Sequence, residues 1–288
     1  MNLMKSRPFE QIDVFSATPY RGNPLAVVPD GSGLDDAAMQ RFAAWTNLSE
    51  TTFLLPPTRA EADYRVRIFT PAGELPFAGH PTLGSCHVWL SSGGQPRRAG
   101  EVVQESAVGL VRIRRGAQRL AFAAPPLRRS DPAPAQLAQV ARALGLKPQE
   151  IRAAQLLDNG PLWLALLVDD PQTVLALTPD HARLRELGLK VGVVHLDAAK
   201  AGAGPDAPAL LVRAFAAPVG VAEDPVTGSL NAALAQWLIG AGMAPSRYVA
   251  SQGECLGRAG RIFIEQDAEG TTWVGGDVVT CITGSALL

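Results

Sequence analysis

Two similar stretches, half a chain length apart, constrain the fold more than any other feature of this sequence. One runs from Phe77 to Leu90 and the other from Phe215 to Leu238, and each joins a short polar turn to an apolar segment. A shift of 144 residues, half of the 288, repeats the pattern x-Pro-x-x-Gly-Ser without a gap and places His80 over Asp224. Internal repeats at a fixed offset indicate duplicated structural units. The sequence therefore predicts two similar domains, each organised around one helix.

The second stretch predicts a buried helix whose start can bind an anion. Pro225 suits the first position of a helix, the following residues are apolar, and Gly240 can end it. Asp224 would then lie at the helix start and cap it. The first backbone N–H groups of a helix have no partner within it, and they attract negative charge. The free N–H groups would be those of Thr227, Gly228 and Ser229.

The rest of the chain predicts an α+β fold with two domains. Short alternating segments are separated by Gly, Pro and polar turns, which is typical of many short strands around a few helices. We predict a first domain at 1–124 with a central helix at 81–91. We predict a second domain at 125–288 with a central helix at 226–239, and leave open that the C-terminal end crosses back to the first domain.

Composition and charge narrow the class of protein. The residues are 47% hydrophobic and 18% charged, which provides apolar material for two cores. The net charge of −1 offers no basic patch for nucleic acid, and the longest apolar run, Leu162 to Val168, is too short to span a membrane. Three cysteines in no disulfide or zinc spacing, and a start without the apolar run of a signal peptide, predict a cytoplasmic location. We therefore expect a small-molecule partner, and neither nucleic acid nor a membrane.

Three side chains are candidates for acid/base chemistry. Glu50 precedes an apolar strand, His80 precedes the first central helix, and Asp224 takes the matching place in the repeat. Each has an ordinary alternative: an exposed loop glutamate, a structural histidine or a helix cap. A partly buried glutamate, however, would have a raised pKa and could act as a base or an acid. The matching places of His80 and Asp224 favour the functional interpretation.

The sequence contains none of the common cofactor or nucleophile signatures. It has no phosphate loop, no dinucleotide fingerprint and no Gly-x-Ser-x-Gly elbow. His80 and His87 lack a third metal ligand at a usual spacing. Cys86 lies inside the predicted first helix rather than at its start, where the helix dipole would activate a thiol. We therefore expect no metal and no cofactor.

Four motifs follow one another along the chain: Gly22-Asn23-Pro24-Leu25-Ala26-Val27, Asn47-Leu48-Ser49-Glu50-Thr51, Phe77-Ala78-Gly79-His80-Pro81-Thr82 and Glu223-Asp224-Pro225-Val226-Thr227-Gly228-Ser229. In this order they resemble the motifs of the PhzF-like family of phenazine-biosynthesis isomerases, and the resemblance covers nearly the whole chain. Gln252-Gly253 and Gly257-Arg258 near the end also match. Together the motifs are specific for the family and much less specific for the substrate.

The resemblance implies the fold of diaminopimelate epimerase. That fold has two pseudo-symmetric domains, each a β-barrel-like sheet around a central helix, with the site between them. In cofactor-free racemases of this fold, a cysteine stands at the start of each central helix. Here His80 and Asp224 would stand at those places, which disfavours a two-thiol racemase mechanism.

The resemblance also implies a role for each candidate residue. Glu50 would be the general acid/base that moves a proton on a small amino or hydroxy carboxylic acid. His80 and Asp224 would hold the amino or hydroxyl groups and assist the proton transfer. The substrate carboxylate would meet backbone N–H groups, and two further side chains would line the site. The substrate-binding residues would be Gly79, Gly228, Ser229, Asn23 and Ser49.

The leading interpretation is therefore a cofactor-independent, proton-shifting isomerase. One alternative is an epimerase or racemase of a small carboxylate, which would scramble stereochemistry without moving a double bond. Another is a non-catalytic protein that binds a small ligand and has lost turnover. The resemblance makes a homodimer a reasonable expectation, since cyclic dimers are the commonest oligomers.

Overall fold

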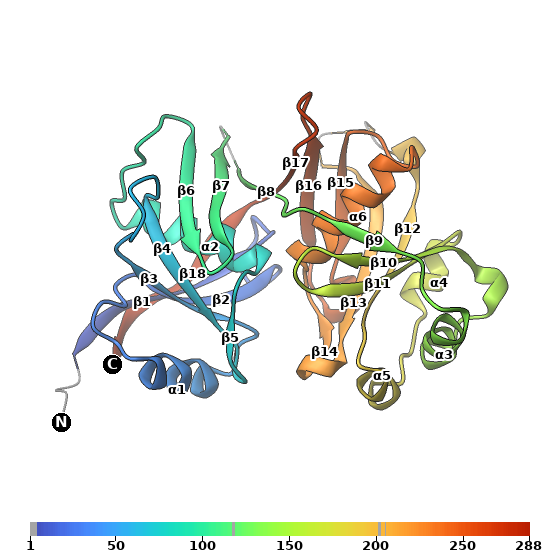
Figure 1. Cartoon of the computed structure of the whole chain (residues 1–288), viewed down its shortest axis with the longest axis horizontal. Coiled ribbons are helices and arrows are strands. Elements are labelled where there is room, and N and C mark those ends of the chain that lie inside the picture. Colours follow the sequence, from blue (N-terminus) through green and yellow to red (C-terminus); the bar gives the residue numbers. More distant parts are fainter. Residues whose placement is uncertain (1–4, 117–118, 201–202, 205) are drawn as a thin grey trace. The chain divides into compact units, whose positions relative to one another are not determined.

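The chain folds into two units, and in each a curved sheet surrounds one central helix (Figure 1). The structure, a computed structural model, describes residues 5–116, 119–200, 203–204 and 206–288. The first unit comprises Met1–Ala123 together with Gly275–Leu288, and the second comprises Ala124–Val274. The last strand of the chain thus belongs to the first unit. The α+β class and the two pseudo-symmetric, barrel-like halves are as the sequence predicted.

The sheet of the first unit follows the order β18-β1-β2-β3-β4-β6-β7-β8, with β5 paired to β4. The pairs β2–β3 and β4–β6 are parallel, and the others are antiparallel. Each parallel pair is joined through a helix, as parallel strands require. The elements are β1 (Ser6–Val14), β2 (Asn23–Val28), α1 (Asp36–Thr46), β3 (Thr51–Leu55), β4 (Tyr64–Phe69), β5 (Glu74–Leu75), α2 (Gly79–Ser91), β6 (Glu101–Ser106), β7 (Gly109–Arg115), β8 (Leu120–Ala123) and β18 (Val278–Leu287).

The sheet of the second unit repeats this order of pairings. It runs β9-β10-β11-β12-β13-β15-β16, with β14 paired to β13, and the parallel pairs are β11–β12 and β13–β15. The strands are β9 (Arg128–Ser130), β10 (Ile151–Asp158), β11 (Leu162–Val168), β12 (Lys190–Leu196), β13 (Pro208–Ala216), β14 (Val221–Asp224), β15 (Arg247–Gln252), β16 (Gly260–Gln266) and β17 (Thr272–Gly276). The helices are α3 (Pro134–Leu144), α4 (Pro171–Leu175), α5 (His181–Leu187) and α6 (Gly228–Gly240), with short 3₁₀ turns at Pro148–Glu150, Ala198–Lys200, Ala217–Val219 and Glu254–Leu256.

The two central helices, α2 and α6, are apolar on nearly every side because strands surround them. Nine residues of each are buried. A helix that is hydrophobic all round belongs in a core. In each unit a glycine lets the central helix pack closely against the sheet, but the glycine lies on a different element. A Cβ at Gly84 of α2 would lie 2.6 Å from Leu25, whereas in the second unit the glycine is on the strand, where a Cβ at Gly192 would lie 2.7 Å from Leu230 of α6.

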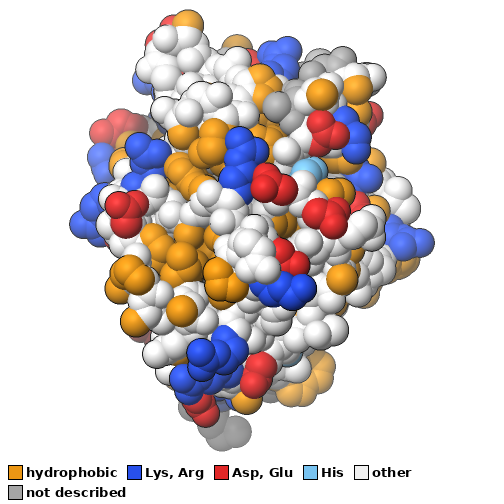
Figure 2. Space-filling model, turned by 90° about the vertical axis from the view of Figure 1, so that its right-hand side faces the viewer, with side chains coloured by type: hydrophobic (Ala, Val, Ile, Leu, Met, Phe, Trp, Pro, Cys, Tyr) orange, Lys and Arg blue, Asp and Glu red, His pale blue; other side chains and the backbone are white. Residues whose placement is uncertain are grey.

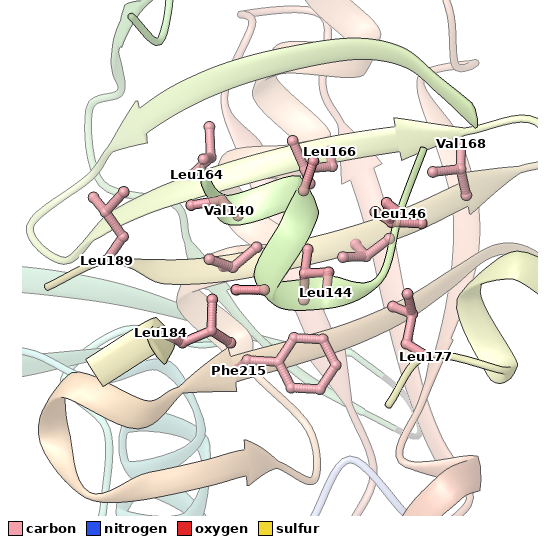
Figure 3. Packing of buried hydrophobic residues seen from close by; sticks show 14 of the residues in the cluster. Val140, Leu144, Leu146, Leu164, Leu166, Val168, Leu177, Leu184, Leu189 and Phe215 are labelled. Carbon is pink, nitrogen blue, oxygen red and sulfur yellow. The ribbon is translucent and has the colours of Figure 1, made fainter. Parts of the chain in front are cut away.

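Strand β11 shows why the sheet of the second unit has two apolar faces. Six of its seven residues are buried. Alternate side chains of a strand point to opposite faces. Leu164 and Leu166 belong to a core cluster with Val140 and Leu144 of α3, which covers the outer face (Figure 3). The β11 side chains on the opposite face include Trp163, whose indole N–H contacts Ser229 of α6.

The structure corrects the alignment of the internal repeat. The central helices begin at Gly79 and Gly228, which are 149 residues apart, rather than at 81 and 226 as predicted. At this offset the pattern Glu-x-Pro-x-x-Gly matches, from Glu74 in one unit and from Glu223 in the other. His80 therefore corresponds to Ser229 and not to Asp224. The 144-residue alignment was wrong because a short x-Pro-x-x-Gly-Ser pattern carries no information about where the helix begins.

The charged side chains are mixed on the face that Figure 2 views. Basic and acidic groups alternate there, and the described side chains on this face form no single-sign patch. No helix among the described residues is both long and apolar enough to cross a membrane.

Candidate functional site

The start of α2 is a polar centre with no capping side chain. Ala78 is the N-cap residue and forms no side-chain cap. The first-turn N–H groups of Gly79 and His80 therefore have no acceptor within the helix, and Pro81 has no N–H. Such a helix start carries a partial positive charge and suits an anion.

His80 is buried at this helix start and is neutral at pH 7. Only 5% of the residue is exposed. Its Nδ1 lies 3.3 Å from the amide Nδ2 of Asn23, a fully buried residue at the first position of β2. Burial lowers the pKa of His80 to about 3, against the opposing effect of a hydrogen bond with the Pro24 backbone. Within the described residues, Nε2 of His80 is buried without a hydrogen-bond partner, which is unusual for a buried polar atom.

Glu50 faces His80 from the neighbouring strand. It directly precedes β3, and its side chain is 15% exposed. The carboxylate Oε2 of Glu50 lies 3.4 Å from Nε2 of His80. Because β2 and β3 are parallel neighbours, Asn23 and Glu50 both lie at the N-terminal ends of their strands, on the same edge of the sheet. The structure thus brings Asn23, Glu50 and His80 together, and Ser49, which is half-buried, immediately precedes Glu50.

The start of α6 differs from the sequence prediction in its capping. Asp224 is not the N-cap and Pro225 is not the first helical residue, since α6 begins at Gly228 after the N-cap Thr227. Asp224 is the last residue of β14 and pairs with Ala214 of β13, which holds it in a strand conformation. Its carboxylate Oδ2 accepts a hydrogen bond of 2.6 Å from the Thr227 hydroxyl. Asp224 therefore lies just before the helix and is bound to its N-cap residue.

Gln252 occupies the place that the sequence analysis gave to Asp224. Its Oε1 accepts from the backbone N–H of Thr227 at 3.0 Å and from the side chain of Asn231 at 2.9 Å. Its Nε2 donates to the carbonyl of Asp224 and to the hydroxyl of Thr227. The N–H of Thr227 is therefore not free to bind an anion, contrary to the prediction. Those of Gly228 and Ser229 remain without acceptors inside the helix.

A hairpin from β10 to β11 supports Ser229. Asn159, in the turn, donates its side-chain N–H to the Ser229 carbonyl at 2.9 Å. The indole N–H of Trp163 donates to the Ser229 hydroxyl at 3.3 Å. The sequence did not mark Asn159 or Trp163 as site residues, because both contacts join residues more than 60 positions apart. Gln252 carried a weak signal, as the one amide in the apolar strand Tyr248-Val249-Ala250-Ser251-Gln252.

Other titratable groups lie outside these two centres. Burial raises the pKa of the Cys86 thiol to about 12, so Cys86 is no nucleophile at neutral pH. His87 contacts the Thr280 hydroxyl at 3.3 Å, and burial lowers its pKa. Among the described residues, no group of three or more His, Cys, Asp or Glu side chains is placed to hold a metal ion.

Comparison with known proteins agrees with this architecture. The family model described as phenazine biosynthesis-like protein, PhzC-PhzF, matches residues 12–284. Antisense-enhancing sequence 1 of Schizosaccharomyces pombe is 33% identical over 307 aligned positions, which cover 99% of this chain and 100% of that protein. The trans-2,3-dihydro-3-hydroxyanthranilate isomerase of Pseudomonas aeruginosa is 33% identical over 265 positions, 90% of each chain.

A solved structure shows the same fold. The PhzF-family phenazine biosynthesis protein of Bacillus anthracis superposes with a TM-score of 0.85 at 21% identity, over 99% of this chain and 100% of that one. The resemblance seen in the four sequence motifs is confirmed by the family match. The chain therefore belongs to the phenazine biosynthesis-like (PhzC-PhzF) family and is an isomerase.

Proposed function

We propose that this isomerase shifts a proton on a small amino or hydroxy carboxylic acid without a cofactor, with Glu50 as the general acid/base. The observation that carries the proposal is the contact of 3.4 Å between Glu50 and the buried, neutral His80 at the start of α2. A carboxylate beside a neutral imidazole can accept a proton without forming a buried ion pair, which would be costly. General acid/base catalysis needs this kind of positioned group.

The proposed reaction keeps protons and electrons balanced. Glu50 takes the proton from one carbon of the substrate, and the electron pair of that C–H bond forms a new double bond. The adjacent double bond shifts, and its far carbon receives the proton from the protonated Glu50. His80, neutral at pH 7, holds a polar group of the substrate through Nε2. The product is an isomer, and no oxidant or reductant is consumed.

The substrate carboxylate is proposed to bind at the helix starts. The unshared N–H groups of Gly79, Gly228 and Ser229 are suited to it, and Asp224 is suited to an amino or hydroxyl group. In this proposal both helix starts act on one substrate in a cleft between the units, with Asn23 and Ser49 lining the His80 side. Removal of water would strengthen each of these contacts.

A relative suggests which compound to try first. The similar Pseudomonas aeruginosa protein is named for trans-2,3-dihydro-3-hydroxyanthranilate, which carries a carboxylate, an amino group and a hydroxyl group. We propose this class of compound as substrate. A racemase using two thiols is disfavoured, because the two helix starts present His80 and Ser229, and Cys86 lies buried within α2.

The test is solvent deuterium incorporation. Wild type, Glu50→Gln and the exposed-site control Glu61→Gln are incubated with trans-2,3-dihydro-3-hydroxyanthranilate in deuterated water, and the products are followed by NMR. We expect deuterium on a ring carbon with wild type and the control, and a rate ~10²–10⁴-fold lower with Glu50→Gln. An unchanged rate in Glu50→Gln would remove Glu50 from this role. No incorporation by wild type, with this compound and with a panel of amino and hydroxy acids, would overturn the proposed reaction.

A further inference from the structure

A buried ion pair lies next to Asp224. The guanidinium of Arg213, on β13, donates from Nε and Nη2 to the two carboxylate oxygens of Glu223 at 3.0 and 2.8 Å. Both side chains are less than a tenth exposed. Nη1 of Arg213 also donates to the carbonyls of Val174 and Leu177, at 3.1 and 2.9 Å. Every edge of the guanidinium is thus fixed, so Glu223 has a single position.

A corresponding but more exposed pair exists in the first unit, where the Glu74 side chain is 38% exposed and Arg67 also donates to Asp36. Arg67 on β4 donates from Nε and Nη2 to the two oxygens of Glu74, both at 2.7 Å. The guanidinium of each arginine also lies over the ring of a phenylalanine two residues later. The distance from Cζ to the ring centroid is 5.0 Å for Arg67 and Phe69 and 5.1 Å for Arg213 and Phe215. In each unit the glutamate is followed, five residues later, by the glycine that begins the central helix. The pair is therefore a shared device that fixes the chain entering each central helix.

We propose that the Arg213–Glu223 pair positions Asp224 for catalysis. Successive residues of a strand point to opposite faces, so fixing Glu223 on the outer face of β14 sends Asp224 to the inner face. There Asp224 is opposite the buried Ala214 and reaches the N-cap residue Thr227. In the first unit the residue after the glutamate is Leu75, which has no carboxylate to place. The same device thus has a chemical consequence in the second unit alone.

This inference rests on the role proposed for Asp224, and a purely structural role is its rival. A buried ion pair that loses one partner is strongly destabilising, so a lower melting temperature alone would not distinguish the two. Glu223→Gln is the suitable variant, because it keeps the size and one acceptor oxygen while removing the two-pronged contact. Glu74→Gln is the control, since it makes the same change in the corresponding, more exposed pair of the first unit.

The test combines a double-mutant cycle with an NMR reporter. In the deuterium assay we expect Glu223→Gln to lower the rate about 10-fold or more in the wild-type background, as misplaced catalytic groups do. In an Asp224→Asn background it should lower the rate no further than ~2-fold, because residues acting as one unit are not additive. Glu74→Gln should stay within about 2-fold of wild type.

The NMR reporter needs no substrate. The γ-methyl resonance of Thr227 is identified by its shift in Asp224→Asn, which removes the carboxylate that Thr227 contacts. This resonance should move in Glu223→Gln and stay in place in Glu74→Gln. A stationary Thr227 resonance in Glu223→Gln, or fully additive losses in the cycle, would overturn the inference. If wild type shows no exchange with any compound, the proposed reaction fails, and the Thr227 resonance alone decides whether Glu223 positions Asp224.

Discussion

The starts of the two central helices share a scaffold and differ in their chemistry. In each unit a buried glutamine, on the strand that runs parallel after the helix, contacts the fourth helical residue: Gln104 contacts Thr82 of α2, and Gln252 contacts Asn231 of α6. In neither helix does the N-cap residue form a side-chain cap. The two helix starts thus share a buried glutamine beside the fourth helical residue and lack a capping side chain.

The groups around these helix starts are different. At α2 the functional groups are a neutral, buried imidazole and a carboxylate from a neighbouring strand, Glu50. At α6 they are a half-buried carboxylate, Asp224, and the serine that corresponds to His80. In the proposed function, this duplicated scaffold supplies a proton-transfer centre in one half and a binding centre in the other. Where the two halves differ, a substitution in one can be compared with its counterpart in the other.

The largest difference in stability should come from the two buried glutamines. Gln252 makes four hydrogen bonds around the start of α6, three of them to Asp224 and Thr227. Among the described residues, the amide of Gln104 bonds to side chains alone, accepting from the Tyr64 hydroxyl and donating to Thr82. Since buried groups left without partners are costly, we expect Gln252→Leu to cost about 3 kcal/mol or more and Gln104→Leu about 1–2 kcal/mol.

Urea unfolding of both variants at pH 7 measures this comparison. Equal losses of unfolding free energy in the two variants would mean that the additional hydrogen bonds of Gln252 do not stabilise the fold. A loss in Gln104→Leu that exceeds that in Gln252→Leu would contradict the account of the two helix starts.

A smaller effect should appear as a pH dependence confined to α2. The folded pKa of His80, about 3, lies below the ordinary value of 6.5, so between these values the unfolded chain binds more protons. Folding stability should therefore fall as the pH drops below 6.5, by about 1.4 kcal/mol for each pH unit. In His80→Asn this contribution should be absent, and the melting temperature should fall less between pH 7 and pH 5 than it does in wild type.

His87 provides the control for this measurement. Burial lowers its pKa also, but it is less deeply enclosed, and His87→Asn should flatten the pH dependence less than His80→Asn does. Identical curves for wild type and His80→Asn would show that His80 titrates normally and is open to water.

Local patterns predicted much of the fold and only part of the candidate site. The apolar runs and the glycines placed both central helices within about two residues, the boundary accuracy that such patterns allow. Two separate motifs contain Glu50 and His80 and indicated their residue types, but the contact of 3.4 Å between them depends on how α2 and β3 come together in the fold. The assignment of Asp224 as a cap failed, because its strand pairing with Ala214 and the amide of Gln252 come from distant positions.

Glu223 shows the same limit. The sequence presents it as a charged residue in a loop, which is most often solvated. Its burial depends on Arg213, whose guanidinium is held in turn by carbonyls that lie 36 and 39 positions from Arg213 in the sequence. No local signal marks such a residue, although the spacing Glu-x-Pro-x-x-Gly in both halves was present in the sequence and would have given the correct repeat.

The central proposal is that one ligand binds at both helix starts. We would test it by titrating wild type, His80→Asn and Asp224→Asn calorimetrically with 3-hydroxyanthranilate. This aromatic analogue has the same carboxylate, amino and hydroxyl groups, but the carbon that bears the hydroxyl has no hydrogen to transfer. The account predicts one site per chain and a loss of about tenfold or more in affinity for each variant, since each removes a hydrogen bond to the ligand. Two sites per chain, or an affinity unchanged by either substitution, would contradict it.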